Sequence, residues 1–306
     1  MERHRVERQT SLLEALEAMY AGRSRRDLRE LVRDGRVRVD GREQSLADLR
    51  AVVRGGALVE CARFGRPQSI HGQVRLVHED DDILVVEKDV GILTEPSGVG
   101  ARGARVPTVA SVLTEHLRRR GSSRSAHPCH RLDRDVSGLL AFATSARVAA
   151  SVRDDPRHHL AERVYLALVE GCPEPFEGTI ESFLADGDDQ VVRETAADAG
   201  KLARCRYRVL ASNARHALVE VRLETGRKNQ IRAQLAAQGW PIAGDRKYGA
   251  RGDPLGRIGL HARSLVLVHP VSRARLAFES PAPFGLDGRV ATQTGRAPPG
   301  ARRRAR

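Results

Sequence analysis

The sequence predicts an α+β protein in which a small unit of helices and short strands precedes a larger, strand-rich domain. In the first part, apolar residues recur at helical spacing over residues 12–20 and 25–34, and short alternating segments follow. In the second part, apolar or alternating segments at 83–88, 139–143 and 163–171 are typical of strands. Two short helices and a small sheet are therefore expected before a domain built mainly on strands.

The composition indicates a globular chain with a polyanionic partner. Its 306 residues, 41% hydrophobic and 30% charged, suffice for one large domain and a small one. Lys and Arg number 52 against 39 Asp and Glu, which gives a net charge of +13. Nucleic acid is the natural partner of such a charge, although a general bias toward alanine, arginine and glycine would also produce it. The aromatic content of 4% argues against a general platform for stacking single-stranded bases.

The start of the chain and the cysteines predict a reduced, cytoplasmic protein. Residues 1–10 are charged and lack the apolar segment of a signal peptide, and no later segment approaches membrane-spanning length. The cysteines are widely scattered, at positions 61, 129, 172 and 205. Since they show no paired spacing, neither a disulfide framework nor a zinc ribbon is expected.

Residues 10–61 are expected to form a compact unit of two helices and a small sheet. Residues 37–42 alternate and then turn at Asp40-Gly41, as a short hairpin does, and residues 57–61 could pair with it. Arginines of this unit would contact phosphates, although a solvated helix face fits a single helix equally well. The candidate residues are Arg23, Arg25, Arg26, Arg29, Arg33 and Arg36.

A linker and a hairpin follow the first unit. Residues 62–72 are polar and interrupted by Gly and Pro, which predicts a linker. Strands are expected at about 74–77 and at 83–88, joined by an acidic turn at residues 80–82. This hairpin, which ends in Lys88, opens the larger domain.

The stretch GVGARG at residues 98–103 matches the G-x-G-x-x-G pattern of dinucleotide-binding proteins. A nicotinamide or flavin enzyme is therefore one alternative. The pattern should lie between a strand and an immediately following helix, but Pro96-Ser97 precedes it and Val106-Pro107 interrupts the residues after it. A glycine-rich loop is the better interpretation, and an amphipathic helix is expected after it, from about residue 109.

The segment HRLDRDVSGLL at residues 130–140 is the centre of the larger domain. Asp133 lies between Arg131 and Arg134, just before the apolar strand at 139–143. Near a low-dielectric interior a carboxylate needs a cationic partner to stay ionised, and one of these arginines or an arginine from elsewhere could serve. A salt-bridged turn without chemistry is the alternative.

The residues just before this segment, His127-Pro128-Cys129-His130, could suggest a metal site. The sequence has no second pair of ligands at the spacing of a structural zinc site. We therefore predict no metal, and expect Pro128 to stiffen the approach to the turn and His130 to hydrogen-bond in place.

Two later segments add candidate residues. The strand at 163–171 contains Tyr165, which could stack on a base or be an ordinary core tyrosine. The segment TGRKNQIR at 225–232 begins a helix, and its cations with the helix N-terminus would make an anion-binding corner or simply cap the helix. These cations are Arg227, Lys228 and Arg232.

In order and spacing, these segments resemble the motifs of the RluA-type pseudouridine synthases. The family pattern His-Arg-Leu-Asp, two variable residues, then Thr-Ser-Gly is similar to HRLDRDVSG. The pattern Lys/Arg-x-Tyr-x-Ala-x-Val-x-Gly matches RVYLALVEG, and Thr-Gly-Arg-Thr/Lys-His-Gln-Ile/Leu-Arg is similar to TGRKNQIR. Shorter matches continue through GWPIAGD at 239–245, Tyr248-Gly249, LHA at 260–262 and His269-Pro270. The resemblance covers about residues 72–284.

The resemblance implies a role for several residues. The catalytic aspartate of the family falls on Asp133, its active-site tyrosine on Tyr165, and its active-site arginine, which would pair with the aspartate, on Arg232. Ile231 would pack on the uracil ring, and Arg131 would help to fill the gap left by an extruded nucleotide. The predicted substrate-binding residues are Arg131, Ile231, Arg227 and Lys228. The departures from the family pattern are Val136 for threonine and Glu95 and Asn229, each for histidine.

The N-terminal unit resembles the small alpha-L RNA-binding domain, on SRR at 24–26, LVRDGRV at 31–37 and VDG at 39–41. The resemblance predicts the domain order: a flexible N-terminus (1–9), the alpha-L domain (10–61), the linker (62–72), a synthase domain with a central mixed, mostly antiparallel sheet flanked by helices (73–285), and a basic disordered tail (286–306).

The implied function is isomerisation of uridine to pseudouridine in RNA, most naturally in large-subunit rRNA by analogy with family members that carry such an N-terminal domain. The reaction needs no cofactor, and the protein is expected to be a monomer that binds neither membrane nor a nucleotide cofactor. The alternatives are a tRNA pseudouridine synthase and an inactive RNA-binding or ribosome-assembly protein of the same fold. The dinucleotide-dependent enzyme is a distant third.

Overall fold

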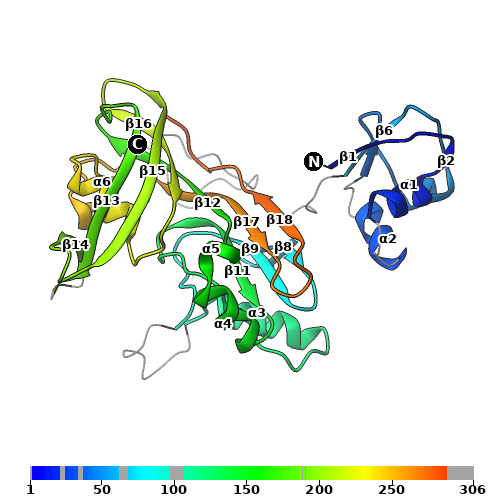
Figure 1. The fold of residues 1–306 in the computed structure, drawn as a ribbon, viewed down its shortest axis with the longest axis horizontal. Coiled ribbons are helices and arrows are strands. Elements are labelled where there is room, and N and C mark those ends of the chain that lie inside the picture. The colour runs from blue at the N-terminus through cyan, green and yellow to red at the C-terminus, as the bar shows by residue number, and fades with distance from the viewer. Residues whose placement is uncertain are drawn as a thin grey trace, which may run out of the picture.

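The computed structural model describes residues 2–20, 25–33, 37–61, 68–96, 106–187, 189 and 191–287. These residues form two units, each with its own sheet and its own apolar core (Figure 1). The glycine-rich segment at 98–103 and nearly all of the predicted tail lie outside the described residues.

The N-terminal unit combines two helices with a four-stranded sheet in the order β1-β6-β3-β4. A capping box starts α1, because Ser11 accepts from the Glu14 amide while the Glu14 carboxylate accepts from the Ser11 amide. The predicted hairpin and its pairing with residues 58–61 are confirmed. The elements are β1 (Glu2–Arg5), β2 (Thr10–Ser11), α1 (Leu12–Met19), α2 (Arg25–Arg33), β3 (Val37–Val39), β4 (Arg42–Glu43), η1 (Leu46–Arg50), β5 (Val52–Val53) and β6 (Leu58–Cys61).

Two segments that the sequence predicted to be irregular contain strands. Residues 2–5, expected to be flexible, form the edge strand β1 against β6, and the next residue, Val6, is buried. Residues 68–71, expected to belong to the linker, form β7 against β8, while 62–67 lie outside the described residues. Both are edge strands rich in polar side chains, so the alternating apolar signal of a half-buried strand is absent.

The larger unit is built on a twelve-stranded sheet with the order β14-β13-β15-β16-β12-β17-β11-β9-β8-β7, in which β10 also pairs with β11 and β18 with β17. Among the described strands the pair β11 and β17 is parallel and the other pairs are antiparallel, so the mixed, mostly antiparallel sheet is confirmed. The strands are β7 (Gln68–His71), β8 (Val74–Glu79), β9 (Ile83–Lys88), β10 (His127–Pro128), β11 (Ser137–Ala143), β12 (Glu162–Glu170), β13 (Glu177–Asp186), β14 (Val192–Thr195), β15 (Lys201–Ser212), β16 (His216–Leu223), β17 (Leu260–Val268) and β18 (Arg275–Glu279).

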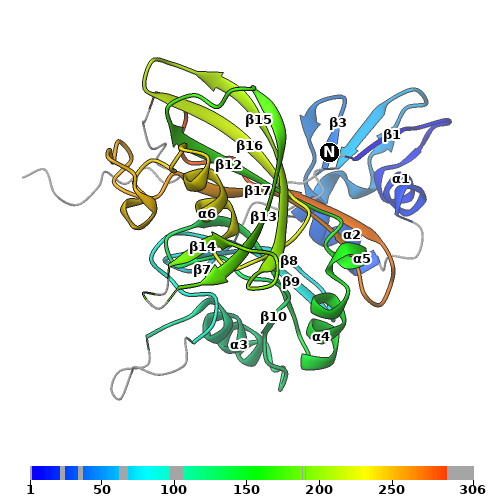
Figure 2. The ribbon, with the colours of Figure 1, turned by 60° about the vertical axis from the view of Figure 1, so that its left-hand side comes forward.

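Helices cover both faces of this sheet, as Figure 2 shows for α3 and α4 beside its β9–β11 part and α6 beside its β13–β16 part. On β11, Leu140 and Phe142 belong to the core under α3 and α6, whereas Leu139 and Ala141 belong to the core under α4. This two-sided burial explains the unbroken apolar sequence of β11. The helices are α3 (Val109–Arg119), α4 (Ala146–Asp154), α5 (Pro156–His159) and α6 (Gln230–Ala237), with a 3-10 turn η2 (Arg246–Tyr248).

The start of β11 lies unusually close to β17. Gly138 has φ +119°, and a Cβ at this position would overlap the backbone of Ala262. Only glycine permits both the backbone conformation and the close approach. Ser137 and Gly138, which follow the Asp133 turn, therefore fix the position at which the chain enters β11 beside β17.

The described helices include none that is both long and apolar enough to cross a membrane.

Candidate active site

The turn that carries Asp133 connects β10 to β11 and is fixed on both sides of the aspartate. On one side, the Thr94 hydroxyl donates to the Leu132 carbonyl (2.8 Å) and accepts from the Leu132 amide (3.2 Å). On the other, the Arg134 carbonyl accepts from Lys88 Nζ (3.0 Å) and from the Gly91 amide (2.8 Å). The backbone around Asp133 is therefore held by residues from a segment much earlier in the chain.

Lys88 is a structural partner of this turn that sequence reasoning did not identify. Its side chain is fully buried, and burial lowers its pKa to about 8. Its ammonium group donates to the carbonyls of Asp89 (2.9 Å) and Arg134 (3.0 Å). The available signal was its position at the end of a strand that begins with four apolar residues, because a lysine there has to find buried acceptors.

Arg232 lies behind Asp133 and holds one of its oxygens. Its Nη1 donates to Asp133 Oδ2 (2.9 Å), while its Nε and Nη2 form a forked pair with Asp245 (2.6 and 2.9 Å). The guanidinium also lies 4.9 Å from the centre of the Tyr248 ring. Burial acts against the charge, but Asp245 and then Asp133 raise the pKa of Arg232. The cation is thus fixed before any substrate arrives.

Asn229 provides a second group for Asp133. It precedes α6 in the left-handed conformation, with φ 50°, which asparagine tolerates better than most residues. One orientation of its side-chain amide gives both ends a suitable hydrogen-bond partner. In this orientation the amide nitrogen donates to Asp133 Oδ2 (2.6 Å) and Oδ1 (3.0 Å), and the amide oxygen accepts from the Tyr248 hydroxyl (3.1 Å). Asn229, a departure from the family pattern, therefore contacts the predicted catalytic carboxylate directly.

A small cavity of about 60 Å³ opens next to Asp133. Tyr165 from β12 and Ile231 from α6 line it, together with the apolar side chains of Val136, Leu223 and Leu260. Burial raises the pKa of the Tyr165 hydroxyl, opposed by Arg163 and reinforced by Asp133. The cavity offers a planar ring an apolar surface with a carboxylate at one edge.

The structure brings together most of the residues that the sequence selected. Asp133, Tyr165, Arg232, Arg131, Ile231 and Arg227 all line the cavity. Lys228 does not, because its ammonium group turns away to Asp186 of β13 (2.5 Å). This placement of Lys228 has a long-range cause, since the aspartate lies 42 residues earlier in the chain.

Arg131 stands at the rim of the cavity, with its side chain 72% exposed. Its Nη1 lies 3.4 Å from Glu95 Oε1, and Glu95 is another departure from the family pattern. An exposed ion pair of this kind contributes little stability, so Arg131 is available for other contacts.

The structure describes the side chains of only two of the six predicted RNA-binding arginines. Arg25 is exposed and pairs with Glu17 (2.7 Å), and Arg29 is exposed on the same helix. Arg23 and Arg36 lie outside the described residues, as do the side chains of Arg26 and Arg33. The basic face of this unit therefore stays a prediction.

The His127–His130 segment has no metal-site geometry in the described structure. His130 Nε2 accepts from the Ala141 amide (3.1 Å), as expected for a histidine that fixes the strand. Within the described ranges, no group of three His, Cys, Asp or Glu side chains could hold a metal ion.

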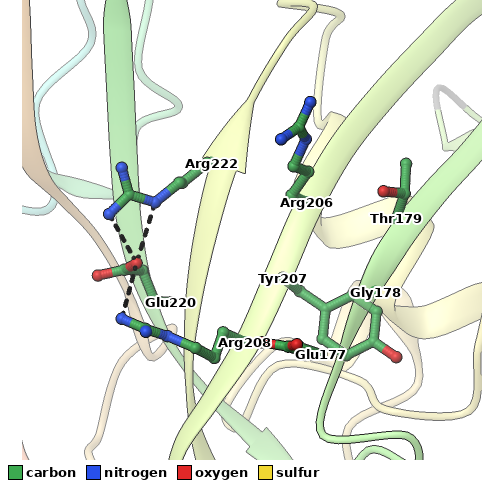
Figure 3. A pocket seen from close by; sticks show the side chains of 8 residues that line it. All are labelled: Glu177, Gly178, Thr179, Arg206, Tyr207, Arg208, Glu220 and Arg222. Atoms are coloured by element: carbon green, nitrogen blue, oxygen red, sulfur yellow. Dashed lines mark hydrogen bonds and ion pairs between the residues drawn. The ribbon is translucent and has the colours of Figure 1, made fainter.

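A larger hollow of about 550 Å³ lies on the outer face of β13, β15 and β16 (Figure 3). Arg206 and Arg208 point outward, alternating with Cys205 and Tyr207 of the core. Arg208 and Arg222 converge there on Glu220 (3.6 and 3.0 Å). None of the residues predicted for catalysis lines this hollow, so size alone does not identify the site.

Buried His261 makes the stability of the fold sensitive to acid. Its Nδ1 lies 2.8 Å from Ser137 Oγ, and burial lowers its pKa to about 4. The unfolded chain binds the proton below about pH 6.5, whereas the folded protein does not until about pH 4, so stability falls as pH decreases through this window. We expect the free energy of unfolding to drop by on the order of 2 kcal/mol between pH 7 and 5 from this group. Urea unfolding at both pH values checks this, and His261→Gln should show a smaller drop; an equal drop would contradict it.

Residues 82–237 match the family model described as RNA pseudouridylate synthase. The chain is 34% identical over 218 residues to the uncharacterized RNA pseudouridine synthase YhcT of Bacillus subtilis, with 71% of each chain covered. It is 31% identical over 283 residues to the ribosomal large subunit pseudouridine synthase D of Pseudomonas aeruginosa, covering 87% of this chain and 86% of that protein.

Solved structures show the same fold. The human RNA pseudouridylate synthase domain containing 1 superimposes with a TM-score of 0.56 at 23% identity, covering 75% of this chain and 94% of that one. The human RNA pseudouridylate synthase domain containing 4 gives a TM-score of 0.55, also at 23% identity, over 70% of this chain and 90% of that one. At this level of identity the likeness concerns the fold alone.

Proposed function

The chain belongs to the RNA pseudouridylate synthase family and is an RNA pseudouridine synthase, and we propose that it isomerises specific uridines of large-subunit ribosomal RNA with Asp133 as its catalytic aspartate. The observation that carries the proposal is the position of Asp133. Its carboxylate borders the cavity that Tyr165 and Ile231 line, and Arg232 and Asn229 hold it from behind.

The reaction rearranges one nucleotide without gain or loss of a group. The bond from ring N1 to ribose C1′ breaks, the uracil turns within the site, and ring C5 bonds to C1′. The hydrogen on C5 leaves as a proton and N1 takes up a proton, so the product is an isomer. No oxidant, reductant or group donor enters this balance, which agrees with the expectation that no cofactor is required.

Asp133 would act in its ionised form. It could attack the sugar or the ring directly, or promote elimination at the sugar, and its place beside the cavity fits both routes. Arg232 and Asn229 donate to it from behind, which keeps its oxygens oriented before the base arrives. Tyr165 and Ile231 would hold the two faces of the uracil as it turns.

The target base must leave its stack to reach this cavity. Extrusion costs a few kcal/mol, which contacts in the pocket and to phosphates offset. Arg131 is suited to fill the vacated space, because it stands exposed at the rim and its contact with Glu95 is weak.

Two observations favour large-subunit rRNA. Relatives from Pseudomonas aeruginosa and Nitrosomonas europaea, 31% and 33% identical, carry the name ribosomal large subunit pseudouridine synthase D. The N-terminal unit adds a separately folded module that would enlarge the RNA contact. A tRNA substrate is the alternative. The domain boundaries, the monomeric state and the cytoplasmic location stay predictions.

The proposal is tested by measuring the product in RNA. Unmodified transcripts of large-subunit rRNA and of tRNA are incubated with the protein, digested to nucleosides and separated by chromatography. We expect pseudouridine in the rRNA. Pseudouridine in tRNA alone would correct the substrate, whereas tight RNA binding without product in either would favour the inactive RNA-binding alternative.

Removal of residues 1–61 should weaken RNA binding and reduce its dependence on salt. The larger domain should still fold, because the N-terminal core draws only on residues 6–61. Each lost phosphate contact lowers the slope of log affinity against log salt by about 0.7–0.9. Filter binding to the rRNA transcript at several salt concentrations checks this, with an unfolding curve as the folding control. An unchanged slope would remove this unit from the RNA contact.

A further inference from the structure

Arg163 is a cation without a visible partner near the candidate active site. It lies on β12, two residues before Tyr165. Its Nε is buried and has no hydrogen-bond partner. Its two Nη atoms form no hydrogen bond or ion pair with any residue that the structure describes, and the side chain as a whole is only partly buried.

The burial of Nε is costly, because a donor removed from water is stabilised only by a hydrogen-bond partner. The other interior arginines near the site have such partners. Arg232 is paired with Asp245 and Asp133, and Arg257 donates to Ser137 Oγ (2.6 Å). Burial lowers the pKa of Arg163, but arginine stays protonated in proteins. The free protein therefore retains a positive charge with unused donors.

The surroundings of Arg163 place it at the edge of the cavity. Its Nη1 occupies the space beside Gly226, where a Cβ would lie 2.5 Å away. The following residue, Arg227, lines the cavity. Burial raises the pKa of Tyr165, and the charge of Arg163 opposes that rise. Burial and, after it, the charge of Arg163 lower the pKa of His130 to about 3. The guanidinium thus lies within electrostatic reach of Tyr165 and against the loop before α6.

Among the residues that the structure describes, no nearby carboxylate is free to neutralise the charge of Arg163. Asp133 already accepts from Arg232 and Asn229. Glu162, the preceding residue, pairs with Arg222 on the opposite face of the strand. An anionic partner for the accessible Nη atoms would therefore come from outside the described residues.

We propose that Arg163 binds a backbone phosphate of the RNA beside the target uridine. The inference rests on the proposed function. Residues two apart on a strand share a face at about 6.8 Å, so a base against Tyr165 has its phosphates within reach of Arg163. A phosphate suits the planar fork of the guanidinium, and Gly226 leaves room for the side chain to stay beside the cavity.

Two variants change this contact in different ways. Arg163→Met removes the charge and keeps an apolar side chain in this partly buried place. Gly226→Ala keeps Arg163 but puts a methyl group where its Nη1 lies, and the flexible guanidinium can move aside. Arg147→Met is the matched control, because Arg147 is exposed on α4 at the other face of the sheet.

The test measures affinity for the large-subunit rRNA transcript against salt, with every variant in an Asp133→Asn background to prevent turnover. We expect Arg163→Met to lower the slope by about 0.7–0.9 and Gly226→Ala to lower it in part, with Arg147→Met unchanged. Since the lost charge was unpaired, the melting temperature of RNA-free Arg163→Met should equal or exceed that of its parent.

A parental slope retained in Arg163→Met, even with weaker binding, would overturn the proposal and indicate a contact to an uncharged part of the nucleotide. A lower melting temperature of Arg163→Met would also count against it, because it would reveal a structural partner. If the parent binds neither the rRNA nor a tRNA transcript in a salt-dependent way, the proposed function fails, and the phosphate contact with it.

Discussion

Asp133→Asn should reduce pseudouridine formation to below about 10⁻³ of the wild-type rate while leaving RNA affinity within about twofold. The substitution removes the negative charge and the basic or nucleophilic oxygen, and acid–base steps alone contribute factors of about 10²–10⁴. It keeps the shape of the side chain, and Arg232 retains its forked pair with Asp245. Single-turnover kinetics on the rRNA transcript, with filter binding alongside, separate the two effects.

The matched control for this variant is Asp135→Asn. Asp135 lies in the same turn but does not line the cavity, so turnover should change little. Equal loss in both variants would indicate a general disturbance of the turn. Wild-type turnover in Asp133→Asn would remove Asp133 from the chemistry.

Arg232→Lys should lower turnover by at least about 100-fold, because a lysine cannot reach Asp133 and Asp245 together. The guanidinium now donates to Asp133 with Nη1 and to Asp245 with Nε and Nη2. A misplacement of about 1 Å at a reacting group can cost about 10²-fold. Asp245 is 1% exposed, and a poorly paired buried carboxylate should also destabilise the fold by about 1–3 kcal/mol.

Arg222→Lys separates these two consequences. Arg222 contacts Glu220 (3.0 Å), a carboxylate that is also mostly buried, on the outer face of the sheet. We expect a loss of stability there without a comparable loss of turnover, measured by urea unfolding and single-turnover rates. If Arg232→Lys loses stability but keeps its rate, Arg232 supports the fold and does not position Asp133.

Much of the fold could be predicted because its interior segments carry strong local signals. The apolar strand β11 and the helix α3 lie where their patterns indicated. The strands β1 and β7 were missed, since charged and polar edge strands carry no such pattern. The order of the sheet could not be predicted from local patterns, because pairings such as β11 with β17 join segments far apart in the chain.

The site was predicted as a set of residues but not as a network. The motifs selected Asp133, Tyr165 and Arg232, and these line one cavity. The contacts that hold them come from Lys88, Thr94 and Asp245, which only the folded chain brings close. The contact of Asn229 with Asp133 depends on a left-handed backbone conformation, so sequence reasoning saw Asn229 only as a departure.

The most direct test of catalysis by Asp133 is tritium release from RNA labelled at C5 of uridine, measured for the wild type and Asp133→Asn side by side. Bond formation between C5 and C1′ displaces that hydrogen, so release reports the isomerisation itself. We expect release from large-subunit rRNA with the wild type and none above background with Asp133→Asn. Equal release by both proteins would contradict the assignment of Asp133, and no release from either rRNA or tRNA by a wild-type protein that binds both would contradict catalysis.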